Sequence, residues 1–384
     1  MLQRAGGRSR YDAMRRTSPP FRADQVGSLL RPKELLLARK QREQGEITEA
    51  ALRALEDRCI RDVVKLQEDV GLQGITDGEF RRAIFHVDFL KRLHGVTVSA
   101  SEYKVKFRGQ GKEIDFSPPV LGVASRLERP VGGVAIDDFK FLKSVTTRTA
   151  KLCIPSPSML HFRGGRGSVD RNAYPDIAEF FEDLARVYRE EVADLARVGC
   201  TYLQLDDTNL AYLCDPEHRE RARAIGEDPN KLPSIYAKLI SDSVRGRPAS
   251  LSTCIHLCRG NFRSTWVAEG SYEAVAETLF NEIDVNAFFL EYDDSRSGGF
   301  EPLRFVPKDK LVVLGLITSK RPELEDKDVI KRRIEEAARY VPLENLALSP
   351  QCGFSSSEHG NDLTVEDQIA KLRHVVEIAR EVWG

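Results

Sequence analysis

The chain has 384 residues, of which 41% are hydrophobic and 30% are charged, and its formal net charge is −1. This composition is typical of a globular protein with a substantial core, and it excludes the strongly basic balance of a nucleic-acid-binding protein. No run approaches the roughly 20 apolar residues that a membrane span needs, so we expect no membrane association and a cytoplasmic location.

The first 19 residues differ from the remainder of the chain. They carry several arginines against the single acid Asp12, and they show no apolar periodicity. We predict a disordered tail over residues 1–19, with an arginine-rich targeting segment as the alternative. Residues 20–384 contain no long flexible linker and are predicted to form a single domain.

From residue 20 onwards, short apolar runs alternate with longer segments of helical spacing. This alternation predicts an α/β protein with a parallel sheet, and eight strands is the number that closes a (β/α)8 barrel, the TIM barrel. The predicted strands are Val26–Leu29, Gly74–Thr76, Leu152–Pro155, Tyr202–Leu205, Leu251–His256, Ala287–Glu291, Leu311–Ile317 and Leu346–Ser349. The predicted helices are Pro32–Glu43, Thr48–Val70, Ile177–Val198, Leu232–Arg245, Tyr272–Asp284, Asp326–Tyr340 and Val365–Trp383.

Two local features refine this pattern. The segment from about residue 95 to 144 contains Ser117-Pro-Pro-Val and alternates like a hairpin, so we expect an insertion over one end of the barrel. Thr364 is followed three residues later by Asp367, which predicts a capping box at the start of the last helix.

Seven cysteines are spread along the chain, an odd number that does not suggest a disulfide framework. We therefore expect a reducing compartment with free or metal-bound thiols. Five of the cysteines belong to no cluster in the sequence and are predicted to be small core residues: Cys59, Cys153, Cys200, Cys214 and Cys254.

Four metal-binding side chains follow predicted strands in the second half of the chain. His256 and Cys258 are two residues apart, a spacing that places both on one side of an extended chain. Glu291 ends the next strand, and Cys352 follows the last one. Carboxyl ends of barrel strands form the face where active sites lie. Each residue alone has an ordinary structural explanation, but together two thiolates, an imidazole and a carboxylate predict a tetrahedral zinc site.

A zinc site of this composition favours thiol chemistry. A free thiol has a pKa of about 8.5 and reacts as the thiolate. Zinc removes the proton from a bound thiol at neutral pH. A site with three histidines would be better suited to activating water. We therefore expect an enzyme that alkylates a thiol substrate.

These residues lie in motifs that resemble the catalytic half of the cobalamin-independent methionine synthase family, and the chain is closest in pattern to its short, single-barrel members. The motifs are Val26-Gly27-Ser28, Thr76-Asp-Gly-Glu79, Leu203-Gln-Leu-Asp206, His256-Leu-Cys258, Glu291 and Cys352. The resemblance implies zinc at His256, Cys258, Glu291 and Cys352, and a homocysteine-like thiol as substrate. It also implies amino-acid recognition by the Val26–Ser28 segment, Glu79 and Asp206, because two carboxylates can hold an ammonium group. Asp206 or its neighbour Asp207 could instead cap a helix.

The chain departs from that family on the side of the methyl donor. The histidine that serves the family as acid is absent from the loop of residues 315–322, where Lys320 is the best-placed replacement. Lys320 could also bind an anionic group of the donor. The tryptophan expected to stack on a pterin is absent too, and the corresponding stretch offers Met159 and His161. The donor is therefore left open between a folate, a corrinoid and a small activated alkyl compound.

Other residues near these motifs have weaker assignments. His86 follows the Glu79 loop and is a candidate for lining the substrate pocket. Arg81, Arg82 and Arg259 are candidates for binding a carboxylate or sulfonate, with a structural role as the alternative. The glycine-rich loop of residues 293–299 is a candidate for movement on substrate binding.

Three functions fit these motifs. The first is methyl transfer to homocysteine, giving methionine. The second is zinc-dependent alkylation of another thiol, as in related enzymes that open epoxides with coenzyme M; a sulfonate thiol would require cations in place of the acidic pair Glu79 and Asp206. The third is a barrel that binds zinc without catalysis. A metal-free decarboxylase-like relative of the same barrels is a further alternative, but it leaves the four predicted ligands unexplained. A homo-oligomer is compatible with the sequence.

Overall fold

The computed structural model describes residues 16–100 and 104–384. The predicted disordered tail lies mostly outside this part of the chain. Its last residues, which are described, contact the barrel: Arg16 Nε donates to the Pro20 carbonyl at 2.8 Å, and Ser252 Oγ donates to the Pro19 carbonyl at 3.2 Å. The prediction of one domain over residues 20–384 stays a prediction.

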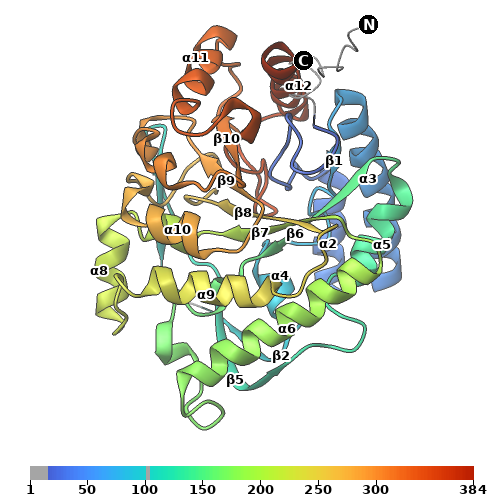
Figure 1. The fold of residues 1–384 in the computed structure, drawn as a ribbon. Coiled ribbons are helices and arrows are strands. Elements are labelled where there is room, and N and C mark those ends of the chain that lie inside the picture. Colours follow the sequence, from blue (N-terminus) through green and yellow to red (C-terminus); the bar gives the residue numbers. More distant parts are fainter. Residues whose placement is uncertain (1–15, 101–103) are drawn as a thin grey trace, which may run out of the picture.

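A curled sheet of seven parallel strands forms the centre of the protein (Figure 1), which confirms the α/β, TIM-barrel-like fold class. Neighbouring strands in the sheet follow one another in the chain, as right-handed βα units require. In this order they are β1 (Gly74–Ile75), β6 (Thr149–Pro155), β7 (Tyr202–Asp207), β8 (Ser252–Leu257), β9 (Ala287–Glu291), β10 (Leu311–Ile317) and β11 (Leu346–Pro350).

The expected strand Val26–Leu29 is wrong in detail, because this segment forms no strand. The residues just before it close one side of the gap between β11 and β1: Asp24 N donates to the Leu348 carbonyl, and Leu348 N donates to the Arg22 carbonyl, both at 2.9 Å. On the other side, Leu29 N donates to the Gly78 carbonyl at 3.1 Å. Gly27 has a φ of 144°, which takes the backbone out of a regular strand.

Helices cover the outer face of the sheet (Figure 1), and their start signals agree with the sequence. Thr48 caps its helix by accepting from Ala51 N, and Thr364 and Asp367 form the predicted capping box. The predicted helix 272–284 is divided into η3 (Tyr272–Ala274) and α10 (Ala276–Glu282). The other outer helices are α2 (Lys33–Glu43), α3 (Glu49–Val70), α6 (Ile177–Arg197), α8 (Pro216–Ala224), α9 (Leu232–Val244), α11 (Lys327–Ala337) and α12 (Val365–Trp383).

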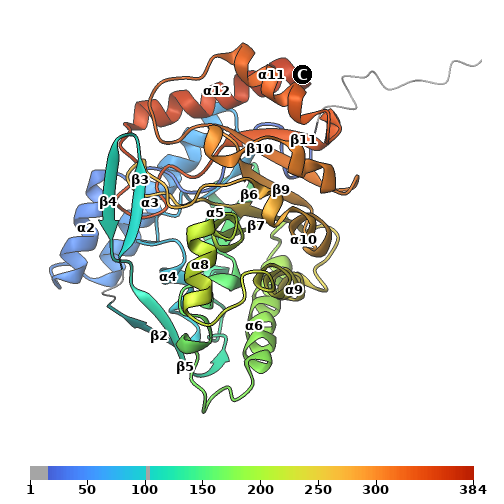
Figure 2. The ribbon, with the colours of Figure 1, turned by 90° about the vertical axis from the view of Figure 1, so that its left-hand side faces the viewer.

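The insertion after β1 contains two antiparallel strand pairs. β2 (His94–Ser99) pairs with β5 (Val120–Glu128), and β3 (Val105–Gly109) pairs with β4 (Lys112–Phe116) as a hairpin outside the central sheet (Figure 2). α5 (Ile136–Val145) packs on β6 and α6, so it belongs to the helical layer of the barrel. The expected insertion of residues 95–144 is therefore too long. Its last part is α5, whose apolar residues have helical spacing and are buried.

Side chains along each strand alternate between two apolar layers. One layer fills the space between sheet and helices, and the other lies inside the barrel, where Tyr202, Cys254 and Phe289 meet. Side chains two and four residues further along the same strands point to the same interior, towards the carboxyl ends. This alternation decides which polar side chains reach the mouth of the barrel.

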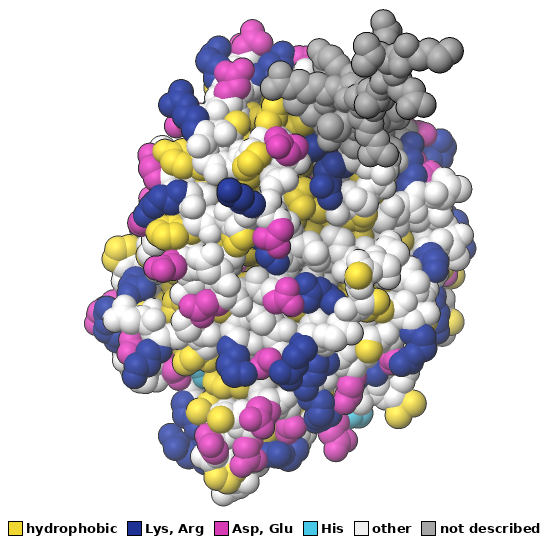
Figure 3. Space-filling model, in the orientation of Figure 1, with side chains coloured by type: hydrophobic (Ala, Val, Ile, Leu, Met, Phe, Trp, Pro, Cys, Tyr) yellow, Lys and Arg dark blue, Asp and Glu magenta, His cyan; other side chains and the backbone are white. Residues whose placement is uncertain are grey.

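The surface is mixed in charge. Figure 3 shows basic and acidic side chains interspersed over the face that it draws. Among the residues that the structure describes, no helix has the length and apolar character needed to cross a membrane.

Candidate metal centre and substrate pocket

The four predicted metal ligands converge at the mouth of the barrel. His256 lies on β8, Cys258 follows this strand, Glu291 ends β9, and Cys352 lies just beyond β11. One donor atom from each lies within 4.8 Å of the others, and all four residues are buried. The alternation of β8 explains the pair, since positions 254, 256 and 258 face the interior together.

The donor atoms of this cluster have the character of metal ligands. Neither nitrogen of the buried His256 imidazole makes a hydrogen bond of normal geometry among the described residues, and the polar group that acts on it most strongly is the Cys352 thiol. A buried polar group without a partner is costly, and a metal ion would satisfy it. Cys258 Sγ and Cys352 Sγ are 3.4 Å apart. Their hydrogen bond lowers the pKa of Cys352 well below its usual value and, together with burial, raises the pKa of Cys258. The set therefore fits zinc.

Residues of the following loops fix the carboxylate of Glu291. Its Oε1 accepts from Arg259 N at 2.9 Å, and its Oε2 accepts from Arg296 Nη2 at 3.1 Å. Arg296 also donates to Asp293 at 2.6 Å. Burial raises the pKa of Asp293 to about 6, while Arg296 opposes this. Partners of this kind orient metal ligands. The sequence analysis singled out the loop of residues 293–299 but not Arg296 within it, because an Asp-x-x-Arg spacing occurs in many loops without a functional role.

An acidic pair lies beside the metal cluster. Glu79 follows β1 and Asp206 lies on β7, and their carboxylate oxygens are within 4.8 Å of each other and of Cys153 Sγ. Glu79 Oε2 has no hydrogen-bond partner in the described part of the chain, and its nearest cation is Arg82 at 3.8 Å. Burial and then the Glu79 charge raise the pKa of Asp206 to about 7. Two neighbouring buried carboxylates attract a further positive group.

The segment Val26–Ser28 forms the wall next to this pair. The Val26 carbonyl accepts from Gln204 Nε2 at 2.6 Å, and the same amide donates to Asp206 at 2.7 Å. The Cβ of any other residue at Gly27 would lie 2.6 Å from Cys153 Sγ. The glycine therefore allows close approach of the backbone to the site. Ser28 Oγ lies against the backbone of residues 353–355, where Ser355 N donates to it at 3.4 Å.

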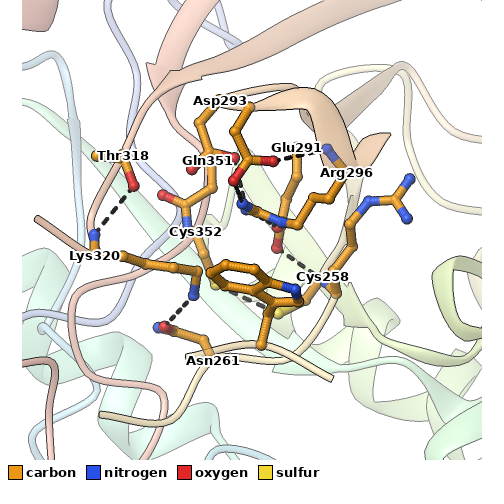
Figure 4. Close-up of polar contacts among 12 residues, drawn as sticks. Cys258, Asn261, Glu291, Asp293, Arg296, Thr318, Lys320, Gln351 and Cys352 are labelled. Atoms are coloured by element: carbon orange, nitrogen blue, oxygen red, sulfur yellow. Dashed lines mark hydrogen bonds and ion pairs between the residues drawn. The ribbon is translucent and has the colours of Figure 1, made fainter. Parts of the chain in front are cut away.

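Lys320 is buried in the loop that follows β10, three residues after the strand ends. Its Nζ donates to Asn261 Oδ1 at 2.7 Å and to the Thr265 carbonyl at 3.2 Å. Figure 4 shows the Lys320 side chain pointing toward Asn261, near the Cys258–Cys352 pair. Its charge lowers the pKa of Cys352. Asn261 was missed, although its spacing from His256 and Cys258 already placed it in the same loop.

His86 lies on the wall of a small, largely apolar cavity of about 60 Å³ that reaches Cys258. Burial lowers the pKa of His86 well below its ordinary value, so the imidazole is neutral. The hairpin β3–β4 covers this cavity. Phe116 on β4 stacks on Phe262 at a centroid distance of 4.4 Å. The hairpin is held to the loop after β8 by Arg108 N, which donates to the Trp266 carbonyl at 2.8 Å.

Most of the remaining candidates make structural contacts, whereas the Arg259 guanidinium lies over the Tyr272 ring and has no hydrogen-bond partner among the described residues. Asp207 accepts from Leu210 N at the start of α7 (Asn209–Tyr212), so the capping role falls to it and leaves Asp206 to the pocket. Arg81 is paired with Glu56, Asp57 and Asp138. Two further residues have other partners than the metal cluster. His161 Nδ1 is hydrogen-bonded to Tyr236 Oη at 2.9 Å, and Met159 Sδ accepts from Thr208 Oγ1. The five other cysteines are buried and free.

Comparison with known proteins gives this barrel and site a family. The model of the cobalamin-independent synthase catalytic domain matches residues 21–381. The chain belongs to this family of barrel synthases, as its motifs predicted.

Individual relatives agree with this placement. The uncharacterized protein YxjH of Bacillus subtilis is 48% identical over 366 residues, covering 95% of each chain. A crystal structure of a putative vitamin-B12-independent methionine synthase from Listeria monocytogenes has a TM-score of 0.76 and 38% identity, covering 96% of this chain and 100% of that one. A 5-methyltetrahydropteroyltriglutamate–homocysteine methyltransferase of Thermotoga petrophila is 23% identical, and the match covers 95% of this chain but 44% of that protein.

Proposed function

We propose that the protein transfers a methyl group to the thiol of homocysteine, giving methionine, with zinc as its metal. The observation that carries this proposal is the register of two neighbouring strands. Asp206 on β7 is paired with His256 on β8, so the acidic pair and the metal cluster are side by side. Neighbouring strands are about 5 Å apart. A substrate whose ammonium group and thiol are separated by a short methylene chain reaches both.

His256, Cys258, Glu291 and Cys352 would hold the zinc, which when bound keeps a substrate thiol ionised at neutral pH. Glu79 and Asp206 bind the ammonium group of the amino acid. Arg82, which donates to the Cys153 carbonyl at 2.9 Å, keeps Glu79 from carrying an uncompensated charge. The backbone of Gly27 and Ser28 borders the carboxylate of the substrate. An acidic pair favours an amino thiol over a sulfonate thiol.

The donor enters from the side of the hairpin β3–β4. The cavity between His86 and Cys258 lies between the metal cluster and the aromatic rings of Phe116 and Phe262, which offer flat apolar faces. In the transfer, the new carbon–sulfur bond forms while the bond between the methyl carbon and the donor atom breaks. The electron pair of the broken bond stays on the donor atom, and Lys320 supplies the proton when that atom is a nitrogen. The names of relatives that act with methyltetrahydropteroyltriglutamate support a folate donor.

The test is methionine formation by the zinc-loaded protein. Homocysteine is supplied with methyltetrahydrofolate or with methylcobalamin in separate reactions, and the Cys352→Ala variant is the metal-site control. We expect turnover with one donor and none in the variant. A full equivalent of zinc with no turnover on either donor rejects methyl transfer to homocysteine, and a protein that binds no zinc rejects the metal assignment.

A second pair of variants tests the ammonium pocket. Glu79→Gln should raise the KM for homocysteine, whereas Glu335→Gln, which alters an exposed carboxylate on α11, should leave it unchanged. An equal KM in both variants contradicts the assignment of Glu79.

A further inference from the structure

A second groove lies at the opposite end of the barrel from the metal cluster. It is bordered by Gln73, which precedes β1, by residues 147–149, which lead into β6, and by the last turns of α12. Its volume is about 630 Å³. We call it the basal groove. The catalytic residues follow the carboxyl ends of the strands, so the basal groove contacts none of them.

Arginine side chains dominate the walls of the basal groove. Arg16, Arg22, Arg148 and Arg380 all line it. No aspartate or glutamate is among the lining residues that the structure describes. The face drawn in Figure 3 has mixed charge, so this local excess of one sign is a distinct feature of the groove.

Within residues 16–100 and 104–384, Arg16, Arg148 and Arg380 have no carboxylate partner, while the charge of Glu344 offsets part of the charge of Arg22. Arg16 donates to the carbonyls of Pro19 and Pro20, and Arg148 donates to the carbonyl of Leu72, so both have neutral acceptors. The exposed Arg380 has no hydrogen-bond or ion-pair partner for its side chain in residues 16–100 and 104–384, and its guanidinium lies over Gly71. Burial and then the Arg16 charge lower the pKa of Arg22 to about 10, as like charges brought together must do.

We propose that the basal groove binds a small molecule that carries two or more linked phosphate groups. Guanidinium groups bind phosphate oxygens through paired N–H donors. The hydroxyls of Thr17, Thr147 and Thr149 add neutral donors along the same walls. Val376 and Ala379 of α12 supply an apolar edge against which the organic part of such a molecule packs. The ligand takes no part in the methyl transfer, and this inference does not depend on the proposed function.

Isothermal titration calorimetry of the full chain with pyrophosphate tests the proposal, with citrate as the polycarboxylate probe. We expect pyrophosphate binding that weakens as the salt concentration rises, because screening reduces the attraction between exposed charges. Arg380→Glu should weaken pyrophosphate binding at least about tenfold, since it replaces an attractive charge with a repulsive one. The fold tolerates this change because the Arg380 side chain is exposed and unpaired within the described residues.

The matched control is Arg339→Glu, which reverses an exposed arginine beyond α11 and changes the net charge equally. It should leave pyrophosphate binding unchanged. Arg148→Gln provides a second variant inside the groove, and its zinc content and methyl transfer should equal those of the unaltered chain. Absence of pyrophosphate binding, equal loss in Arg380→Glu and Arg339→Glu, or tighter binding of citrate than of pyrophosphate would each overturn the proposal.

Discussion

Because Glu79 and Asp206 are buried side by side, we expect that replacing Asp206 by its amide stabilises the metal-free protein. Asp206 is fully buried, and burial with the neighbouring Glu79 raises its pKa from 3.8 to about 7. The Asp206→Asn variant keeps the shape of the side chain, and its amide oxygen still accepts from Gln204 Nε2, which lies 2.7 Å from the native carboxylate. It removes the charge that the folded site disfavours. We therefore expect the metal-free variant to unfold at higher denaturant concentration than the native chain at neutral pH.

The magnitude and its sign follow from the pKa shift. The folded-state pKa is raised above the unfolded value, so between pH 3.8 and 7 the folded chain holds a proton that the unfolded chain has released. In this window native stability falls by about 1.4 kcal/mol for each pH unit as the pH rises. The resulting difference between Asp206→Asn and the native chain is about 1.6 kcal/mol at pH 5 and about 4 kcal/mol at pH 8.

Urea unfolding followed by tryptophan fluorescence measures this difference, with a chelator present to keep the metal cluster empty. Asp309→Asn, at an exposed aspartate, is the control and should show no pH-dependent difference. A stability difference that stays constant from pH 5 to pH 8, or a native chain that is the more stable at pH 8, would refute the reasoning. The same Asp206→Asn substitution should raise the KM for homocysteine, because it removes half of the ammonium pocket.

Three other substitutions test separate parts of the site. Gly27→Ala places a Cβ 2.6 Å from Cys153 Sγ at a φ of 144°. Homocysteine binding measured by calorimetry should therefore weaken at least about tenfold, with the zinc content unchanged. Unaltered binding would contradict the close approach of the backbone to the substrate. Lys320→Met should lower kcat by about 10²–10⁴-fold in single-turnover assays while zinc is retained, as expected for a lost proton donor, and a normal kcat removes Lys320 from the mechanism. Arg296→Gln frees one oxygen of the glutamate ligand and should reduce zinc affinity about 10–100-fold in competition with a chromogenic chelator; equal affinity argues against a positioning role.

Much of the candidate site could be predicted because strand alternation and strand ends are local properties of the sequence. His256 and Cys258 share one face of an extended chain, and Glu291 ends an apolar run, so the positions of these ligands follow without knowledge of any tertiary contact. The choice between Asp206 and Asp207 required the structure, because the direction of each side chain depends on where the strand ends and the next helix begins.

The parts that sequence reasoning missed depend on contacts between distant segments. The stretch Val26–Leu29 has the composition of a strand, but the hydrogen bonds to β11 are made by the preceding residues 22 and 24, and Leu29 bonds to Gly78, so no regular ladder forms. The cover of the cavity requires Phe116 of the insertion to meet Phe262 of the barrel, and nothing local to either residue signals that contact. Asn261 and Arg296 were overlooked for the same reason, since their partners belong to other loops.

The closure of the barrel has a consequence for biosynthesis. The segment that borders the substrate pocket is made among the first thirty residues of this sequence, yet its partner strand β11 begins at Leu346, and the final ligand Cys352 follows that strand. A ribosome releases these parts in order, so the early segment has no neighbour on one side through most of translation. The nascent chain can neither close its barrel nor assemble four ligands around a metal ion until strand β11 and the residues after it have emerged. Under the proposed function, zinc binding and completion of the amino-acid pocket would therefore both await residues 346–352.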